Sequence, residues 1–340
     1  ELFRKCTEEP LMATLEDISR ISGVAKATVS RALRNDATLK LSADTKEKIF
    51  TAAKELGYES KSKKNAGVKS VILVIHKDDH FQNQIDNAFY YSMRTGIENA
   101  CFENSFVCNF VPFGRIETLE NGYNGAIIIG NFIQAELQHI IKSLNTKHLV
   151  FSGLMNFYPD QMDHITYDMY RAEELLLEYL YHKNKRTVVY FGGRETPGIE
   201  ARFSKFYNFK KLLNNYEGME CIGDYHGEHG AQSGYDMMKA WLKENHPLPD
   251  AIVASNDPIA FGVLRAMAEE EMNPGISIIS INGDSSGEIT NPTLTSVDVH
   301  TGRIGEQAVQ LLKNQIESER DYYVKVELKP AIIERNSVGG

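Results

Sequence analysis

Short apolar runs alternate with amphipathic helical segments over most of the chain, from Ser70 onward. Each run is apolar along nearly its whole length, as is typical of a strand covered on both faces of a parallel sheet. We predict strands at 71–75, 106–111, 125–130, 148–153, 187–193, 220–225, 251–256 and 276–282. We predict helices at 89–104, 135–144, 171–182, 203–214, 231–243, 259–270 and 304–318. The rhythm restarts after the helix at 171–182, so it predicts two Rossmann-like subdomains with a ligand cleft beyond the carboxyl ends of their strands.

The last strand-like segments, 294–299 and 322–337, flank the helix at 304–318. We expect them to cross back between the two subdomains, because each subdomain already has its own run of strands.

Residues 13–33 precede this α/β region and have the periodicity of two short helices. Leu15, Ile18 and Ile21 form one apolar stripe, and Val29, Ala32 and Leu33 form the inward face of the second helix. The residues left facing outward are Lys26, Ala27, Thr28, Ser30 and Arg31. This periodicity fits an ordinary helical hairpin as well as a helix-turn-helix, whose second helix can enter a DNA major groove.

Start and stop signals sharpen these helices. Thr14 and Asp17 have the spacing of a capping box, and Gly23 can take the positive φ that ends a helix. A third helix is predicted from Ser42, a good N-cap, to Leu56. Three short helices make a small all-α head.

The run TLEDISRISGVAKATVSRAL, followed by LSADTKEKIFTAAKELGY, strongly resembles the head of LacI-family transcriptional repressors. The shared pattern is a TxxDI start, a GV turn, a TVSR recognition helix and a closing helix that ends in LGY. Ala25 departs from it, because the family usually has Ser before the second helix, and losing that N-cap costs roughly 0.5–2 kcal/mol.

The resemblance continues through the α/β region, in AIVASNDPIAFGVLRA at 251–266, ISIISING at 276–283, NPTLTSVDV at 291–299 and the terminal ERNS. It implies a core like periplasmic sugar-binding proteins, and it runs from about residue 13 to 337. One departure is YHKNKR at 181–186, where the family often has a Gly-His pair before the strand.

We expect four segments: an upstream extension or cloning remnant at 1–11, the helix-turn-helix domain at 12–58, a hinge at 59–69 and an effector-binding and dimerisation core at 70–340. In the family the hinge folds on operator DNA, and a leucine from it wedges into the minor groove. This hinge, ESKSKKNAGVK, has no leucine, which puts DNA bending in doubt.

The resemblance implies two heads reading the half-sites of a pseudo-palindromic operator as a homodimer. Arg31 could reach guanine O6 and N7, Ala27 a thymine methyl, and Lys26 a base or a phosphate. The predicted contacts to the DNA backbone are Thr14, Thr28, Ser30, Lys61, Lys63 and Lys64. The chain ends soon after ERNS without a leucine heptad tail, which favours a dimer over a tetramer.

The effector is expected to be a small sugar, with galactose or a β-galactoside as the class that the overall resemblance favours. The predicted effector residues are Phe89, Tyr90, Arg202, Asn256, Asp257 and Asn282, with Lys205 replacing Arg202 in an alternative register. Each has a structural alternative: Asp257 before Pro258 is also a good helix start, Arg202 could form a surface ion pair, and Phe89 and Tyr90 could be core.

The net charge of −9 divides unevenly along the chain. Residues 12–67 hold eleven Lys and Arg against seven Asp and Glu, a charge of +4, whereas residues 68–340 carry −12. A basic head on an acidic body is expected when only the head contacts phosphates.

Enzyme motifs are absent from the sequence: there is no GxxxxGK[ST], no GxSxG and no GxGxxG after a strand. GDYHGEHG at 223–230 holds two histidines, but in a glycine-broken loop, where a solvated loop is a better interpretation than a metal site. The four cysteines are scattered, as for buried thiols in a reducing compartment. We therefore expect a cytoplasmic regulator with no cofactor and no catalytic residue. A sugar-binding protein with a vestigial head, a nucleobase effector and a phosphoprotein corepressor stay open.

Overall fold

The computed structural model describes residues 14–33, 39, 41–56, 70–77, 85–119, 122–153, 161–194, 204–244, 246–271, 275–318 and 320–339. The chain divides into two compact units between Lys69 and Ser70. We call the first unit the head and the second the core, and each is described by itself.

The described part of the head contains three helices, α1 (Leu15–Ser22), α2 (Lys26–Leu33) and α3 (Ala43–Glu55). Ile18, Val29 and Ile49 contribute one fully buried side chain from each helix. Ile21 was expected in the apolar stripe, but it is 50% exposed. Residues six apart lie 240° apart around a helix, so Ile21 points away from the face that Leu15 and Ile18 share.

The core contains two six-stranded sheets. In spatial order the first sheet consists of β11 (Lys325–Leu328), β5 (Asp163–Tyr167), β4 (Leu149–Ser152), β3 (Gly125–Ile129), β1 (Val71–His76) and β2 (Val107–Pro112). The second consists of β12 (Ala331–Ile333), β10 (Thr295–Asp298), β9 (Ser277–Asn282), β8 (Ala251–Ala254), β6 (Thr187–Gly193) and β7 (Glu220–Gly227). The strand pairs are parallel, as predicted, except that β12 runs antiparallel to β10.

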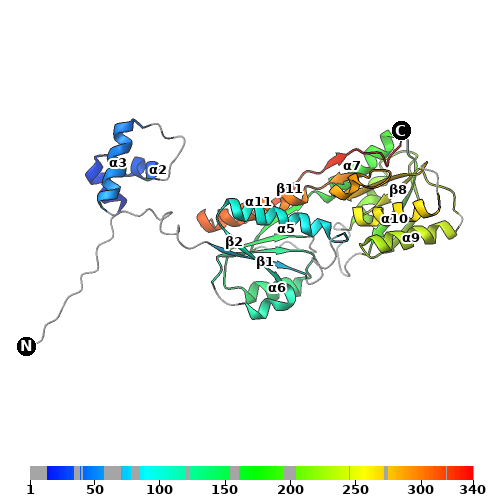
Figure 1. Ribbon diagram of the computed structural model, residues 1–340, viewed down its shortest axis with the longest axis horizontal. Coiled ribbons are helices and arrows are strands. Elements are labelled where there is room, and N and C mark those ends of the chain that lie inside the picture. The colour runs from blue at the N-terminus through cyan, green and yellow to red at the C-terminus, as the bar shows by residue number, and fades with distance from the viewer. Residues whose placement is uncertain are drawn as a thin grey trace, which may run out of the picture. The chain divides into compact units, whose positions relative to one another are not determined.

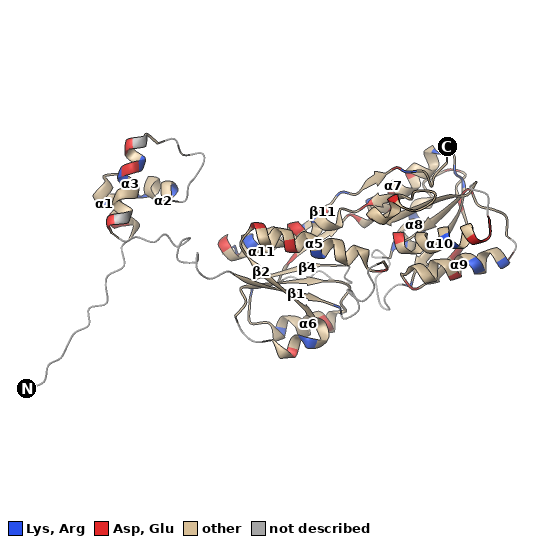
Figure 2. Ribbon diagram, in the orientation of Figure 1, with Lys and Arg blue, Asp and Glu red and all other residues tan. Residues whose placement is uncertain are grey.

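Helices cover both faces of each sheet, so each subdomain has three layers. Helices α5 (Ala88–Glu103) and α11 (Thr301–Ser318) lie on one face of the first sheet and α6 (Gln134–Ser143) on the other (Figure 1). The second sheet is covered by α7 (Met169–His182), α8 (Lys205–Leu213), α9 (Ala231–Lys243) and α10 (Asp257–Glu269). The short 3₁₀ helices are η1 (Phe113–Thr118) and η3 (Ser285–Glu288). Charged residues occur along helices such as α6, α9 and α10, whereas β1 and β4 contain none (Figure 2).

The chain crosses between the subdomains three times, after β5, after β10 and after β11. The predicted crossing of the segments at 294–299 and 322–337 is therefore confirmed. The prediction missed β5, which carries the first crossing, because DHITY begins with two polar residues and lacks the unbroken apolar run of the other inner strands.

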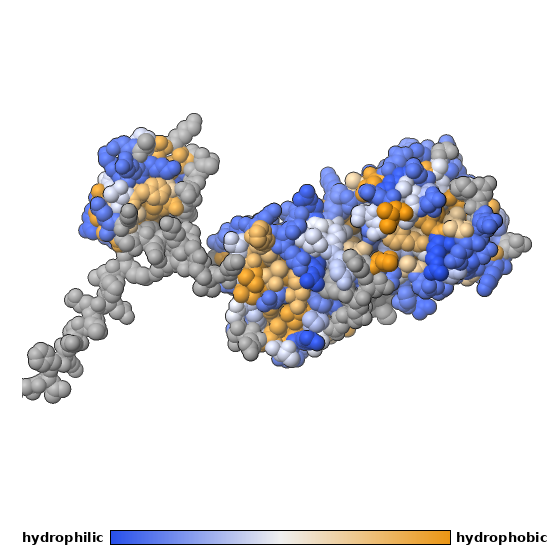
Figure 3. Space-filling view, in the orientation of Figure 1, coloured by the Kyte–Doolittle hydropathy of each residue, from blue (hydrophilic) through white to orange (hydrophobic). Residues whose placement is uncertain are grey.

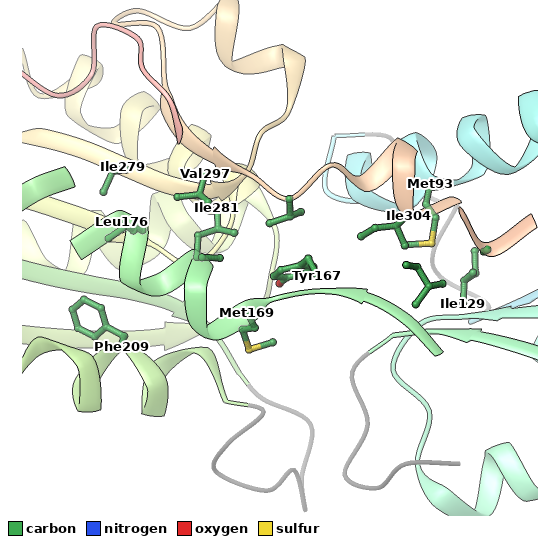
Figure 4. Close-up of a cluster of buried hydrophobic side chains, with 14 of the residues drawn as sticks. Met93, Ile129, Tyr167, Met169, Leu176, Phe209, Ile279, Ile281, Val297 and Ile304 are labelled. Atoms are coloured by element: carbon green, nitrogen blue, oxygen red, sulfur yellow. The ribbon is translucent and has the colours of Figure 1, made fainter. Parts of the chain in front are cut away.

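Three apolar clusters form the interior of the core. The first, which we call the shared cluster, is continuous through both subdomains, from Met93 and Ile304 to Phe209 and Ile279 (Figure 4). The other two are private, one beneath α9 and α10 in the second subdomain and one beside α6 in the first. The two subdomains are thus joined by buried side chains as well as by crossing strands.

Apolar side chains also reach the surface of the first subdomain (Figure 3). Phe102, near the end of α5, is 86% exposed, and Val107, at the start of β2, is 38% exposed. Strand β2 is an edge strand and alternates between more and less exposed residues, unlike the inner strands.

Candidate DNA-binding head and ligand cavity

Helix α1 begins at a reciprocal cap. The Asp17 N–H donates to the Thr14 hydroxyl at 3.3 Å, and the Thr14 N–H donates to the Asp17 carboxylate at 3.0 Å. Hydrogen bonds from the Thr14 hydroxyl and backbone lower the pKa of Asp17, and the charge of Arg20 adds to this. The predicted capping box is confirmed, and it fixes where α1 starts.

Hydroxyls of α1 fix the turn that leads into α2. Gly23 takes φ 68°, as predicted, and the Ser19 hydroxyl donates to the Val24 carbonyl at 2.7 Å. The first helical bond of α2 runs from Val29 N–H to the Ala25 carbonyl at 3.0 Å. Ala25 has no side-chain acceptor, so the orientation of α2 depends on the turn rather than on a cap of its own.

Five of the predicted DNA-contacting residues belong to α2. Lys26, Ala27 and Arg31 are exposed, whereas Thr28 and Ser30 are half-buried. Lys26 Nζ lies 3.1 Å from Glu16 Oε1, but both side chains are largely exposed, so this pair contributes little and a phosphate could replace Glu16. The predicted phosphate contacts Lys61, Lys63 and Lys64 lie outside the described residues.

In the core, a cavity of about 850 Å³ lies where the two subdomains face each other. Its wall from the first subdomain is the face of α5 that includes Ala88, Phe89 and Ser92, and its wall from the second is the segment 282–286. The start of α11, including Thr301 and Glu306, closes one side. The volume lies in the range of small-molecule sites, and the lining is rich in Ser, Thr, Asn and Asp.

Two of the predicted effector residues meet in this cavity. Phe89 lines it from α5, and Asn282 lines it from the end of β9. Gly283 follows with φ 75°, and a Cβ there would lie 2.5 Å from Asp298 Cα, so only glycine lets this segment pass close to β10. Tyr90 contacts the Phe89 ring edge-to-face, with centroids 5.3 Å apart, but does not line the cavity.

Asn256 and Asp257 lie at the start of α10 and do not line this cavity. The Asn256 side chain accepts from Ile259 N–H and donates to the His229 carbonyl, both at 2.9 Å. The Asp257 carboxylate is completely buried and accepts bonds of 2.5–2.6 Å from the Ser280 and Ser296 hydroxyls and from the Asp284 N–H. Burial raises the pKa of Asp257, against these hydrogen bonds.

In this structure Asn256 and Asp257 therefore start a helix rather than bind a ligand, since their polar atoms hold α10 and the ends of β9 and β10. Arg202 lies outside the described residues. Lys205, the residue of the alternative register, donates from Nζ to the Ser255 carbonyl at 2.6 Å, at the carboxyl end of β8.

Sequence reasoning missed the crossover between β10 and α11 as a source of cavity residues. His300 and Thr301 line the cavity there, and His300 Nδ1 lies 2.7 Å from Asp298 Oδ2. The signal was available, because the segment at 294–299 was expected to cross between subdomains and polar residues flank its end.

The histidines of GDYHGEHG pack on glycines. The His229 ring occupies the space where a Cβ at Gly193 would stand, and His226 Nδ1 lies 3.2 Å from where a Cβ at Gly192 would stand. His226 lies on β7, which runs to Gly227, so its assignment to a loop was wrong. Among the described residues, no cluster of three or more His, Cys, Asp or Glu could hold a metal.

Comparison with known proteins agrees with both halves of the chain. Residues 14–60 match the family described as "Bacterial regulatory proteins, lacI family", and residues 177–338 match the periplasmic binding protein-like domain. The chain belongs to the LacI family of transcriptional regulators. Helix α2, with its TVSR sequence, is therefore the recognition helix of a LacI-family head.

Full-length relatives support this assignment. The transcriptional regulator GalR of Streptococcus thermophilus is 28% identical, over 96% of this chain and 99% of the relative. The transcriptional repressor MelR of Bacillus subtilis is 29% identical, over 96% of this chain and 98% of the relative.

Solved structures share the fold of this LacI-family chain. The regulator CelR in complex with cellobiose superposes with a TM-score of 0.68 at 21% identity, over 96% of this chain and 99% of that one. The lac repressor dimer bound to operator gives a TM-score of 0.65 at 18% identity, with the same coverage. No helix in the described ranges is both long enough and apolar enough to cross a bilayer.

Proposed function

We propose that the protein is a dimeric repressor of a carbohydrate-utilisation operon, released from operator DNA by a small sugar. The observation that carries this proposal is one chain that joins a recognition helix with exposed Lys26 and Arg31 to a core whose cavity is lined from both subdomains. In this proposal residues 12–58 bind DNA, 59–69 form the hinge, and 70–340 bind the effector and dimerise.

On the operator, Arg31 makes the base-specific contact. Its exposed guanidinium suits guanine O6 and N7, while Ala27 offers a methyl group to thymine. Lys26, Thr14, Thr28 and Ser30 position the head on the DNA, with Lys61, Lys63 and Lys64 in the hinge.

A sugar fits the chemistry of the cavity. Phe89 offers a flat apolar face for the C–H face of a sugar, and Asn282 both donates and accepts hydrogen bonds. The CelR–cellobiose complex supports a sugar effector, and galactose or a β-galactoside is the class we propose. In the described arrangement Asn256 and Asp257 hold the start of α10 rather than contact the sugar, and Tyr90 packs on the Phe89 ring. Arg202 lies outside the described residues and remains a proposed sugar contact.

Closure of the subdomains on the sugar selects the arrangement in which the heads no longer fit both half-sites. Operator affinity then falls by the sugar's differential affinity for the two arrangements. The exposed Phe102 and Val107 are apolar surface that a second copy would cover. The proposed activity is regulatory, without catalysis or a cofactor, and it takes place in the cytoplasm with the operator.

Fluorescence anisotropy on the palindrome nearest the protein's own promoter tests this proposal. We expect tight binding that weakens with salt and is released by galactose or lactose. Arg31→Ala should cost about 1–3 kcal/mol on the operator and leave sugar binding intact. Lys48→Ala, which removes an exposed charge from α3, serves as the control.

The outcomes separate the alternatives. An equal loss of Arg31→Ala affinity on all DNA sequences would make Arg31 a phosphate contact. Release by a nucleobase, or by none of the sugars, would replace the effector class. An absence of DNA binding at low salt would favour a sugar-binding protein with a vestigial head.

A further inference from the structure

One carboxylate of the first subdomain reaches the second. Asp86 lies in the turn at 85–87, directly before α5, and its Oδ1 accepts a hydrogen bond from the Ala231 N–H at 2.7 Å. Ala231 is the first residue of α9, which covers the second sheet. The bond therefore spans the boundary between two subdomains that are otherwise joined by three crossings and the shared cluster.

Helix α9 has no side-chain cap of its own. Its N-cap residue is Gly230, which has no side chain to accept a bond from the first N–H groups. These N–H groups lack partners within the helix and carry the positive end of its dipole. A carboxylate at this end acts as an N-cap, so Asp86 caps from the first subdomain a helix of the second.

Gly230 provides the space for this contact. A Cβ on residue 230 would lie 2.8 Å from Asp86 Cγ and 2.9 Å and 3.0 Å from its two carboxylate oxygens. The backbone there, φ −99° and ψ 170°, is open to any residue. Glycine is thus required at position 230 because a Cβ would clash with the Asp86 carboxylate, and not because of the backbone conformation.

The loop that receives Asp86 is anchored within the second subdomain. Asn256 Nδ2 donates to the His229 carbonyl at 2.9 Å, and His229 Nε2 lies 3.1 Å from the Arg194 carbonyl. Asn256 also caps α10, so the receiving loop is tied to the ends of β6 and β8. This role accounts for the GDYHGEHG stretch, which neither DNA nor metal binding explained.

On its other side, Asp86 adjoins the cavity. Ile85, Ala88 and Phe89, its neighbours in the chain, all line it. A ligand that contacts residues 85–89 therefore also affects the position of the Asp86 carboxylate.

We propose that the described arrangement, in which Asp86 meets Ala231, is the closed one, and that Asp86 is a latch that favours it and so sets how much sugar is needed to release the operator. This inference rests on the proposed function, because it assumes that the sugar selects the closed arrangement. Without the latch the closed arrangement is less populated, so sugar binding weakens in proportion, while operator binding without sugar is not reduced.

Two unrelated substitutions break the contact in the full-length protein. Asp86→Ala removes the acceptor, and Gly230→Ala places a methyl group where the carboxylate stands. Each should raise the galactose or lactose concentration for half-release by about fivefold, the usual scale for loss of an N-cap. The double variant should show no further shift, because both substitutions remove one contact.

Two further variants give the matched controls. Asp86→Asn keeps an oxygen that accepts from the Ala231 N–H without the charge, so we expect an intermediate shift. Asp236→Ala removes an exposed aspartate of α9 that accepts a bond from Gln232 on the same helix, and it should leave the midpoint unchanged. Equal shifts in Asp86→Ala and Asp236→Ala would overturn the latch.

Hydrogen exchange without sugar tests the latch separately from the proposed function. In Asp86→Ala the Ala231 amide should exchange faster, because it has lost its acceptor, while amides in the middle of α9 do not change. If this occurs and no sugar releases the operator, the latch stands and the effector class is wrong. If a sugar releases the operator but Ala231 exchange is unchanged, the proposed function stands and the latch is wrong.

Discussion

In each sheet of the core, one edge strand comes from the last part of the chain: β11 lies beside β5, and β12 lies beside β10. In the first subdomain a buried ion pair fixes this strand. Arg320 reaches the Asp163 carboxylate, which is fully buried, and Val324 N–H donates to the same carboxylate at 2.9 Å.

In the second subdomain, hydrogen bonds to hydroxyl groups fix the corresponding edge strand. Arg335 N–H donates to the Thr295 hydroxyl at 3.0 Å, and the Ser337 hydroxyl donates to the Ile278 carbonyl at 2.6 Å. Asp163 and Thr295 both begin the strand that neighbours the edge strand. The Arg335 guanidinium adds a bond to the Leu294 carbonyl at 2.7 Å and an ion pair with Glu288, which is largely exposed. The first edge strand therefore depends on a buried ion pair and the second mainly on hydroxyl groups, so the two should fail differently.

The largest expected effect is in the ion pair. Arg320→Met leaves the Asp163 carboxylate buried without its partner, which should lower the free energy of unfolding by about 3–5 kcal/mol. Ser337→Ala in the second subdomain removes neutral bonds and should cost only about 1–2 kcal/mol. Urea unfolding measures both.

Adding Asp163→Asn to Arg320→Met should restore much of the loss, because no unpaired charge is then buried. An equal cost for Arg320→Met and Ser337→Ala would show that the two fastenings are equivalent.

The shared cluster and the private cluster of the second subdomain should also respond differently to substitution. Ile304→Ala in the shared cluster and Ile252→Ala in the private cluster of the second subdomain should each cost about 2–5 kcal/mol. Their unfolding should differ, because only Ile304 contacts side chains that span both subdomains.

Trp241, the single tryptophan, is buried in the second subdomain and reports on it alone. In Ile252→Ala its fluorescence should change at lower urea than the far-ultraviolet circular dichroism, whereas in Ile304→Ala the two transitions should coincide. Coincident transitions in both variants would contradict a private cluster.

The parts of the fold that could be predicted are those specified locally. Thr14, Asp17 and Gly23 marked the limits of α1, and unbroken apolar runs such as VILVI and AIVAS marked the inner strands. Strand β5 escaped prediction because Asp163 and His164 are buried only through partners far away in sequence, such as Arg320.

The candidate site was predicted less completely. Phe89 and Asn282 could be placed at strand and helix ends, and the structure brings them together. Asp257 was a polar residue at an equivalent strand end, but the Ser280 and Ser296 hydroxyls that engage it are set by strand register, which the sequence pattern does not reveal. No sequence pattern pointed to Asp86, because its partner is a backbone N–H in the other subdomain.

Close helix packing predicts a smaller effect. Gly96 of α5 packs against the Gly302 carbonyl of α11, and Gly262 of α10 packs against the Ala231 carbonyl of α9, with no room for a Cβ at either glycine. Gly96→Ala and Gly262→Ala should each cost about 1–3 kcal/mol.

Gly302→Ala is the matched control, because its Cβ would meet nothing closer than Ser92 Oγ at 3.5 Å. Alanine is the better helix former, so this substitution should be neutral or raise the melting temperature. Destabilisation by Gly302→Ala would contradict the packing argument.

The smallest effect distinguishes the two subdomains by pH. His164 of β5 is buried against the Phe151 ring, and its Nε2 lies 3.0 Å from the Gly153 carbonyl, whereas the strand that plays the same part in the second sheet carries the non-titrating Ser296. Burial lowers the pKa of His164 below its ordinary value. The unfolded chain therefore takes up a proton at this residue at a pH where the folded chain does not, so the free energy of unfolding falls as the pH falls below about 6.5.

His164→Gln removes this contribution, and the stability advantage of the unsubstituted protein over His164→Gln should shrink between pH 7.5 and pH 5.5 in thermal unfolding. An advantage that stays constant over this range would show that His164 takes up its proton equally in both states.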